Sequence, residues 1–337
     1  MFNNKSLLIT GGTGSFGSSF FKNILKNYKP KRVIIFSRDE LKQSLMAKKL
    51  NSKELNLTRF FIGDVRDLNR LMLAMNDVDF VVHAAALKQV DIAEYNPMEF
   101  IKTNIIGSEN IVKAALSTNV SKVIALSTDK ASDPINLYGA TKLTADKIFT
   151  SSNNLVGKKR LKFSVVRYGN VAGSRGSVFP IFKKLIEKKS KFIPITDKRM
   201  TRFWITLDEA VNFVEKCFKV MRGGEIFVPK IPSIKIIDLA KAMAPNIKQK
   251  IIGIRPGEKL HEKMCSANES RQILEFKTFY LIQPSIILDK KKFNYKKNYL
   301  NEAGKSVPLN FEYTSENNPN FLNTKQIIKL NKKLKIT

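Results

Sequence analysis

The stretch SLLITGGTGSFG, at residues 6–17, joins a short apolar run to a glycine-rich loop that leads into a helical pattern. Gly11, Gly14 and Gly17 are spaced three apart in this loop. Glycine lets the backbone turn sharply and approach a pyrophosphate, and the N–H groups at a helix N-terminus bind its charge. The stretch therefore predicts a strand, turn and helix that bind a dinucleotide, with an ordinary glycine-rich turn as the alternative.

Short apolar runs alternate with helical patterns as far as residue 168. Such alternation predicts a parallel sheet with crossover helices, and nearly continuous apolar strands are typical of a sheet covered on both faces. Six strands in this arrangement form a doubly wound α/β fold of the Rossmann type. The predicted strands are 6–10, 32–37, 59–63, 80–84, 122–127 and 163–168, and the predicted helices are 15–27, 39–50, 68–75, 98–117 and 137–151.

The pattern changes after residue 168, where glycine and polar residues cluster at 169–177. We predict a dinucleotide-binding domain at 1–170, to which part of about 205–230 returns, a smaller C-terminal substrate lobe at 171–284, and a basic extension rich in Lys and Asn at 285–337. The later predicted elements are helices at 178–188, 207–221 and 324–334 and a strand at 225–228.

The composition is that of a folded globular protein, with 43% hydrophobic and 26% charged residues among 337. It excludes a disordered chain and a collagen-like repeat. No apolar run approaches the roughly 18 residues that a membrane span needs. Cys217 and Cys265, the only cysteines, have neither metal-binding nor disulfide spacing, so a reducing cytoplasm is the expected location.

The formal net charge is +30, from 59 basic and 29 acidic residues. Such an excess suggests nucleic acid or an anionic membrane as a partner. However, 46 of the basic residues are Lys and only 13 are Arg, and Arg does most of the bidentate reading of phosphates and guanines. We therefore predict no nucleic-acid and no membrane partner, and interpret the basic surface as an attraction for an anionic small molecule.

The strongest catalytic pattern is YGATK at residues 138–142. Residues four apart share a helix face, so the ammonium of Lys142 can hold a ribose and lower the pKa of the Tyr138 phenol. The phenol then serves as an acid or base for a hydroxyl or carbonyl. Any solvated helix can carry this pair, but here a strand that ends in Ser127 and Thr128 lies just upstream. Together these features predict a catalytic site.

The end of the second strand, FSRDE at 36–40, bears on the choice of dinucleotide. An acidic residue there accepts a hydrogen bond from the ribose of NAD, whereas a hydroxyl and a guanidinium suit the 2′-phosphate of NADP. Ser37 and Arg38 come first, and Asp39 is expected to cap the next helix, so NADP is the predicted cofactor. Asp64 ends the third strand, where the adenine amino group would fall, with a plain strand-end turn as the alternative.

These motifs together resemble the extended short-chain dehydrogenase/reductase family. The resemblance assigns the catalytic Ser/Thr, Tyr and Lys to Thr128, Tyr138 and Lys142, and the structural Asn of the family to Asn104. It also implies a homo-oligomer, either a dimer or a hexamer.

Within that family, three segments are similar to the inverting UDP-N-acetylglucosamine 4,6-dehydratases of the pseudaminic acid pathway. They are STDKA at 127–131, SRDE at 37–40 and GIRPGEKLHE at 253–262. The likeness extends from residue 1 to about 284, and weakly over 312–318. It departs at LKQVD, residues 87–91, where the family usually has Lys-His-Val-Pro.

The resemblance implies that a hydride leaves C4 of the sugar and returns to C6. Tyr138, with Thr128 and Lys142, would take the C4 hydroxyl proton. Asp129, kept protonated by burial, would donate to the C6 hydroxyl and expel water. Lys130 would remove the C5 proton, provided that its pKa is depressed between cationic neighbours and the cofactor, which would make it neutral. A plain ion pair between Asp129 and Lys130 is the alternative.

Further residues are expected to bind the two ligands, and no metal is expected. For the UDP end the resemblance points to Asn170, Arg202, Arg255 and Glu258, and a guanidinium suits a pyrophosphate because it binds bidentately. The predicted cofactor-binding residues are Gly11, Thr13, Gly14, Ser15, Phe16, Gly17, Ser37, Arg38, Lys42, Asp64, Val65, Ala84, Ala85, Lys88, Asn104, Tyr138 and Lys142. The predicted substrate-binding residues are Lys88, Asn170, Arg175, Thr201, Arg202, Arg255 and Glu258.

Several other functions stay open at this point. A UDP-sugar 4-epimerase would keep Tyr138 and Lys142 but has no use for Asp129 and Lys130, since nothing leaves C6. A C5-retaining dehydratase would differ only in the face on which C5 is protonated. A dinucleotide-sensing regulatory protein would have no need of the Tyr138–Lys142 pair, and a basic nucleic-acid-binding protein is the remaining alternative.

Overall fold

The computed structural model describes residues 1–174, 177–286 and 294–333. At its centre lies one ten-stranded sheet. Its strands are β1 (Ser6–Thr10), β2 (Arg32–Ser37), β3 (Thr58–Ile62), β4 (Phe80–His83), β5 (Lys122–Thr128), β6 (Lys162–Tyr168), β10 (Ile226–Pro229), β14 (Ile273–Glu275), β15 (Phe279–Ile282) and β16 (Lys305–Ser306). They are arranged in the order β16-β14-β15-β10-β6-β5-β4-β1-β2-β3.

The strands from β3 across to β10 are all parallel to one another, and β15, β14 and β16 add an antiparallel edge. The central order 3-2-1-4-5-6 is that of the doubly wound dinucleotide-binding fold. The predicted fold class is therefore confirmed.

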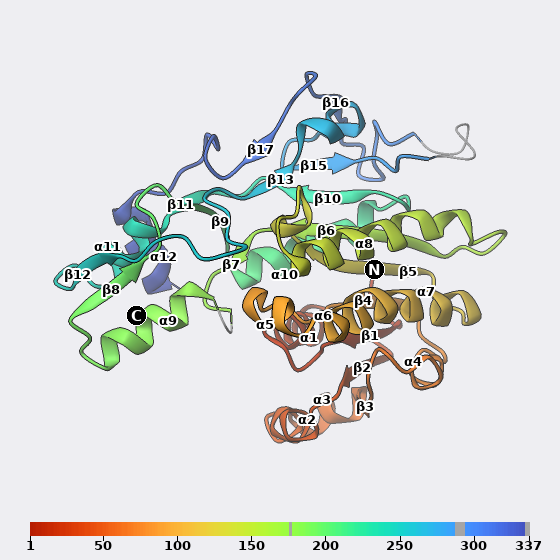
Figure 1. Cartoon of the computed structure of the whole chain (residues 1–337). Helices are drawn as coiled ribbons and strands as arrows, with labels where there is room; N and C mark the ends of the chain where they lie inside the picture. The colour runs from red at the N-terminus through yellow and green to blue at the C-terminus, as the bar shows by residue number, and fades with distance from the viewer. Residues whose placement is uncertain (175–176, 287–293, 334–337) are drawn as a thin grey trace.

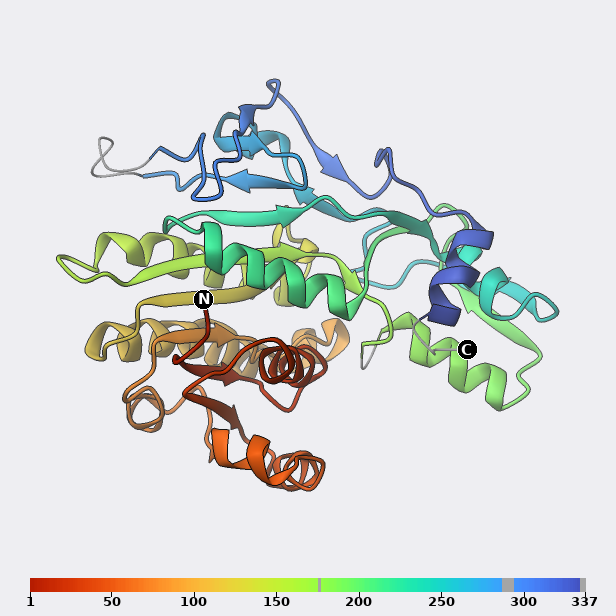
Figure 2. The same ribbon diagram turned by 180° about the vertical axis from the view of Figure 1, so that it is seen from behind.

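Helices cover both faces of this sheet (Figures 1 and 2). On one face α1 (Ser15–Asn27) packs against α10 (Leu207–Val220), and on the other α7 (Gly107–Ser117) packs between α4 (Leu68–Ala74) and α8 (Leu137–Ser151). All five residues of β1 are buried as a result, which explains its unbroken apolar run. The shorter helices of this part are α2 (Glu40–Ala47), α3 (Ser52–Leu57), α5 (Val90–Tyr95), α6 (Pro97–Phe100), η1 (Ile101–Ile106), η2 (Asp129–Ala131), η3 (Ser152–Asn154) and η4 (Ala267–Gln272).

A smaller lobe lies beyond one end of the main sheet, at the left of Figure 1. It contains a three-stranded sheet, β11-β9-β7, and a two-stranded sheet, β12-β8. Trp204, Phe179 and Leu239 are buried in a hydrophobic core of its own. Its elements are β7 (Asn170–Val171), β8 (Phe192–Ile195), β9 (Thr201–Ile205), β11 (Ser233–Lys235), β12 (Lys248–Ile251), α9 (Val178–Glu187), α11 (Ile236–Met243) and α12 (Thr324–Lys333).

The C-terminal residues that the structure describes are docked on both parts of the molecule. Helix α12 packs against α11, and its Ile327 belongs to the core of the lobe. Strand β16 pairs with β14 in the main sheet, and β17 (Tyr313–Thr314) pairs with β13 (Lys263–Cys265). The boundaries at 170 and 284 stay a prediction; residues of β13, β14 and β15 belong to the core of the main sheet, whereas Ile327 belongs to the core of the lobe.

Several elements begin and end where the sequence predicts, including β1, β2, α1 and α8. The predicted helix at 98–117 is instead interrupted by η1, a π-helical segment. There the side-chain amide of Asn104 pairs with both backbone groups of Leu87, at 2.9 Å each, rather than facing solvent. Strands β14 and β15 extend the main sheet, although the sequence assigned their residues to the substrate lobe.

Candidate active site

A cavity of about 1290 Å³ opens at the carboxyl ends of the parallel strands and reaches into the smaller lobe. The loops after β1, β2, β3, β4 and β5 line one side, and residues of α9, β9 and the loop before β13 line the other. In open α/β sheets ligands bind at this edge, because crossing connections leave a crevice there.

The glycine loop after β1 needs the glycines at two positions in particular. Gly11 has a φ of +61°, and a Cβ there would lie 2.9 Å from the backbone of Ala84. A Cβ on Gly17 would lie 2.6 Å from the Gly11 carbonyl oxygen. Any larger residue would therefore push the loop away from β4 and α1. The arrangement leaves the N-terminus of α1 open to the cavity, as the binding of a pyrophosphate requires.

The end of β2 carries the groups predicted to select the cofactor. The hydroxyls of Thr13 and Ser37 lie 2.9 Å apart. Asp39 caps α2 by accepting from the Lys42 backbone N–H at 2.9 Å, as predicted, and its side chain also pairs with that of Lys42. The guanidinium of Arg38 is exposed toward the cavity and lies 3.5 Å from the carboxylate of Asp64.

Asp64, predicted to meet the adenine, is held by Arg66 as well as by Arg38. Its Oδ2 accepts from Arg66 Nη2 at 2.7 Å and its Oδ1 from the Arg66 backbone N–H at 3.0 Å. Burial alone would raise the pKa of this carboxyl, but the hydrogen bonds from Arg66 outweigh burial and lower it. Asp64 is therefore an ionised acceptor at the rim of the cavity.

Tyr138 and Lys142 lie on one face of α8 and both reach the cavity, as the four-residue spacing predicts. Burial raises the pKa of Tyr138 to about 12. Lys142 is 4% exposed, and its Nζ donates to the Leu126 carbonyl oxygen at 2.7 Å. Burial lowers the pKa of Lys142, although Asp146 opposes the shift.

An ion-pair network lies beneath the Tyr138–Lys142 pair. The fully buried Arg167 donates to Asp146 Oδ2 at 3.3 Å, to Glu269 at 3.3 Å and to the Met264 carbonyl oxygen at 2.9 Å. Because Asp146 lies one turn beyond Lys142 on α8, Arg167 joins that helix to the chain segment around β13.

The second catalytic pair, Asp129 and Lys130, follows β5 in the turn η2. Asp129 is 1% exposed, and its Oδ1 accepts from the Thr128 hydroxyl at 3.0 Å and from Lys130 Nζ at 3.2 Å. Among the described residues its Oδ2 has no hydrogen-bond partner. Burial raises the pKa of Asp129, although the charge of Lys130 opposes it, so this carboxyl tends to keep its proton.

Lys130 also lies 2.8 Å from the carboxylate of Glu262, which is likewise 1% exposed. Burial opposes the charge on Lys130, but the two carboxylates outweigh it and raise the pKa of the lysine. The groups around Lys130 therefore favour its charged form, and the neutral amine that the expected mechanism needs stays a prediction. The sequence placed cations around this amine, whereas the fold brings Asp129 and Glu262 against it.

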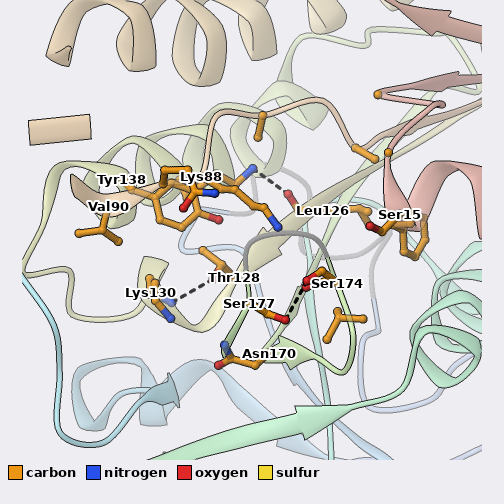
Figure 3. A pocket seen from close by; sticks show the side chains of 18 of the residues that line it. Ser15, Lys88, Val90, Leu126, Thr128, Lys130, Tyr138, Asn170, Ser174 and Ser177 are labelled. Atoms are coloured by element: carbon orange, nitrogen blue, oxygen red, sulfur yellow. Dashed lines mark hydrogen bonds between the residues drawn. The ribbon is translucent and has the colours of Figure 1, made fainter. Parts of the chain in front are cut away.

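Figure 3 shows Tyr138 directed toward Thr128, with Lys130 beside it and Asn170 across the open space. On the lobe side, Arg202 lies 3.7 Å from Glu262 and 3.6 Å from Glu258. The more exposed Arg255 lies 3.4 Å from Glu258. A row of alternating charges thus leads from the catalytic turn η2 to the outer part of the cavity.

The structure brings most predicted site residues to this one cavity. All five predicted catalytic residues line it, as do all predicted cofactor-binding residues except Asn104. Of the predicted substrate-binding residues, Thr201 lies behind the wall, where its hydroxyl bonds His261 Nδ1 at 2.8 Å and Ser315 Oγ at 2.7 Å. Arg175 lies outside the described residues. Whether the lining residues bind ligands stays a prediction.

Glu262 is the residue that sequence reasoning missed. It ends the GIRPGEKLHE segment that carries the resemblance, but nothing in its spacing indicates a contact with Lys130. The segment 87–91, which departs from the family pattern, leads into α5, and its Gln89, Val90 and Asp91 also line the cavity.

Two classes of feature are absent from the part of the chain that the structure describes. No group of three or more His, Cys, Asp or Glu side chains is placed to hold a metal ion. No helix has both the length and the apolar character that crossing a membrane requires.

Comparison with known sequences places the chain among nucleotide-sugar enzymes. The family model described as "Polysaccharide biosynthesis protein" matches residues 7–284. A UDP-N-acetylglucosamine 4,6-dehydratase (inverting) from Campylobacter jejuni subsp. jejuni serotype O:23/36 is 58% identical over 97% of both chains. A UDP-glucose 4-epimerase from Rickettsia bellii is 44% identical over 94% of this chain and 92% of its own.

Among solved structures, the X-ray structure of Pen from Bacillus thuringiensis superposes with a TM-score of 0.89. It is 36% identical in sequence, and the match covers 100% of both chains. The lobe and the C-terminal segment are therefore shared as well as the main sheet.

Proposed function

The chain belongs to the polysaccharide biosynthesis protein family of extended short-chain dehydrogenases/reductases, and on that premise we propose that it is an NADP-dependent, C5-inverting UDP-N-acetylglucosamine 4,6-dehydratase. The observation that carries this proposal is the second catalytic pair. Asp129 and Lys130 share the cavity with Tyr138 and Lys142, so one site holds both an oxidation–reduction pair and an acid–base pair. The 58% identity to an enzyme of this name over nearly the whole chain supports the choice of substrate.

The residues at the end of β2 support NADP over NAD. Ser37 and Arg38 present a hydroxyl and a guanidinium to the cavity, while the nearest carboxylate of that turn, Asp39, is engaged by α2 and by Lys42. A ribose 2′-phosphate would find a charge-assisted partner there. The open N-terminus of α1 would hold the pyrophosphate, and Asp64 the adenine amino group.

The first half of the reaction takes place at Tyr138, Thr128 and Lys142, which we call the cofactor side of the cavity. Tyr138 Oη takes the proton of the C4 hydroxyl, helped by Thr128, and the charge of Lys142 favours the phenolate. When bound, NADP would supply the redox chemistry, as acceptor of the C4 hydride and donor of a hydride to C6. Burial raises the pKa of Tyr138 to about 12, although the charge of Lys130 and the hydrogen bond with Thr128 oppose the shift.

Asp129 and Lys130, on what we call the substrate side of the cavity, carry out the second half of the reaction. The 4-keto group acidifies the C5–H bond, and Lys130 takes that proton. Asp129, whose buried carboxyl tends to stay protonated, donates its proton to the C6 hydroxyl, which leaves as water. The unpartnered Oδ2 of Asp129 supports this role. Reprotonation of C5 from the opposite face gives the L-arabino 4-keto-6-deoxy sugar.

The lobe side of the cavity is proposed to hold the UDP end of the substrate. Arg202 and Arg255 offer guanidinium groups to a pyrophosphate, with Glu258 between them. Asn170 and Lys88 line the cavity nearer to the sugar. The place of the product in pseudaminic acid synthesis and flagellin glycosylation, a cytoplasmic location and a dimeric or hexameric assembly are also proposed on the family resemblance.

A UDP-sugar 4-epimerase is the second candidate, because relatives of that name are 44% identical. An epimerase needs Tyr138 and Lys142 but no acid for C6. Purified protein incubated with UDP-N-acetylglucosamine and NADP distinguishes the two by mass spectrometry of the nucleotide sugar. A dehydratase yields a product lighter by one water, whereas an epimerase yields UDP-N-acetylgalactosamine of unchanged mass, which would refute the proposal.

A further inference from the structure

Glu262 lines the cavity but has no role in the mechanism above. It is 1% exposed, and its Oε1 lies 2.8 Å from Lys130 Nζ and 3.7 Å from Arg202 Nε. Its backbone N–H donates to Ser315 Oγ at 2.9 Å, which fixes the residue in place. Among the described residues, Oε2 has no hydrogen-bond partner. A buried carboxylate is thus held directly against the base that the proposed reaction needs.

Charged and titratable groups of four neighbouring segments surround the Lys130–Glu262 pair. Burial alone would raise the pKa of Glu262, but the charges of Lys130 and Arg202 outweigh it and lower it. Burial instead raises the pKa of Asp129, so the negative charge beside the lysine is favoured on Glu262. The groups that face the pair are Asp129 of η2, Tyr138 of α8, Arg202 of β9 and Lys259 of the loop before β13.

A charged lysine cannot remove the C5 proton, so Lys130 must first lose a proton of its own. Resting on the proposed function, we propose that Glu262 is a positioning residue that holds Lys130 and accepts its proton before the C5–H bond breaks. One Nζ–H bond of Lys130 breaks and an O–H bond forms on Glu262 Oε1. The neutral amine then takes the C5 proton, and the electron pair of the C5–H bond passes to the 4-keto group as an enolate.

The physical reason is the water that the ligands displace. Lys130 has 22% of its side chain exposed to solvent, and this exposure helps to solvate the ion pair. Filling the cavity removes that water, and an ion pair without solvent loses much of its advantage over a neutral amine and a neutral carboxyl. The proton then moves within the pair, at a distance already suited to transfer.

The kinetic test compares Glu262→Gln with the wild type across pH. The amide holds Lys130 less strongly and cannot accept its proton, so the amine must release that proton to solvent. We expect about 10²-fold slower dehydration at pH 7 in Glu262→Gln. We also expect its rate to rise with pH by about tenfold per pH unit, where the wild type shows no rise. Reduced cofactor should accumulate, because C4 oxidation continues while the C5 step is blocked.

A titration without substrate tests the same contact independently of turnover. Lysine-selective ¹³C NMR, with the Lys130 signal assigned by its loss in Lys130→Met, follows the charge of this amine. Removing the Glu262 carboxylate removes one cause of the raised pKa, so Lys130 should titrate at least one pH unit lower in Glu262→Gln. Glu225→Gln is the matched control, since Glu225 is equally buried but lies outside the cavity.

Glu262→Asp keeps a proton acceptor and should restore a rate that does not rise with pH, even if the rate itself is reduced. A uniform loss at all pH values in Glu262→Gln, or loss of C4 oxidation together with dehydration, would overturn the proposal in favour of a structural role. An unshifted Lys130 titration would also overturn it. A wild type that converts no UDP-N-acetylglucosamine while Lys130 shifts as expected would instead contradict the proposed function alone.

Discussion

Among the lysines that line the cavity, Lys142 on the cofactor side and Lys130 on the substrate side have pKa values that shift in opposite directions. Burial lowers the pKa of Lys142, whose Nζ donates to a neutral carbonyl oxygen. At Lys130 the same effect of burial is outweighed by Asp129 and Glu262, and the pKa rises. Burial alone therefore does not decide the charge of an active-site lysine; the carboxylates within about 4 Å of it do.

Tyr138→Phe should have the largest effect, because it removes the group that starts the reaction on the cofactor side. We expect the formation of 4-keto sugar to fall about 10⁴-fold, equivalent to about 5.5 kcal/mol of transition-state stabilisation. Chromatography of the nucleotide sugars measures the rate. Tyr280→Phe, in β15 outside the cavity, is the control. Retention of more than a tenth of the activity in Tyr138→Phe would show that another group takes the C4 proton.

Replacing Lys130 or Lys142 by Met tests the dehydration step and the cofactor-reduction step separately. Lys130→Met should slow dehydration about 10³-fold, or about 4 kcal/mol, yet still reduce the cofactor. Lys142→Met should lose cofactor reduction itself, since it removes the ammonium group that is proposed to hold the ribose beside Tyr138. Absorbance of the reduced nicotinamide after rapid mixing follows the first step in both variants. If both variants lose that step equally, the two sides do not act in sequence.

Arg167→Met tests the buried ion-pair network that Arg167 forms with Asp146 and Glu269 beneath the Tyr138–Lys142 pair. It leaves Asp146 without its buried partner, and we expect a loss of about 3 kcal/mol in the free energy of unfolding. Burial already raises the pKa of Asp146, and without Arg167 it rises further. A carboxyl whose pKa is higher in the folded state favours folding at low pH and loses that contribution as pH rises. The loss should therefore be larger at pH 8 than at pH 5.

Urea unfolding at the two pH values measures this effect. Arg199→Met, which breaks an exposed pair with Asp197, serves as the control and should leave the unfolding free energy unchanged within error. An Arg167→Met variant as stable as the wild type would mean that the buried network contributes nothing to the cofactor side.

Arg38→Ser should have the smallest effect and sharpens the choice of cofactor. The variant loses one charged partner for a 2′-phosphate, so NADP affinity should fall about tenfold, or about 1.4 kcal/mol, while NAD affinity changes little. Calorimetric titration of both dinucleotides measures the difference. Equal losses for NADP and NAD would show that Arg38 does not contact the 2′-phosphate.

Local spacing was enough to predict the cofactor side. The Gly11–Gly17 loop and the Tyr138–Lys142 pair each depend on residues within a few positions of one another, and α1 and α8 begin and end as predicted. The N-cap of α2 by Asp39 could also be predicted from the sequence, because it depends only on the first turn of that helix.

The substrate side could not be predicted in the same way. Glu262 contacts Lys130 because the chain returns past η2 after it has formed the lobe. No periodic pattern in the sequence indicates that contact. The contact with Glu262 that helps to raise the pKa of Lys130 could therefore not be predicted. Asn104 and Thr201 were expected to touch ligands, but their side chains are engaged behind the cavity wall by Leu87 and His261.

The central claim is that the two sides act in turn on one sugar and invert C5. NMR of purified protein with UDP-N-acetylglucosamine and NADP in D₂O tests it most directly. We expect an L-arabino 4-keto-6-deoxy sugar that carries deuterium at C5. A D-xylo product would contradict inversion, and UDP-N-acetylgalactosamine with the C6 oxygen retained would contradict dehydration altogether.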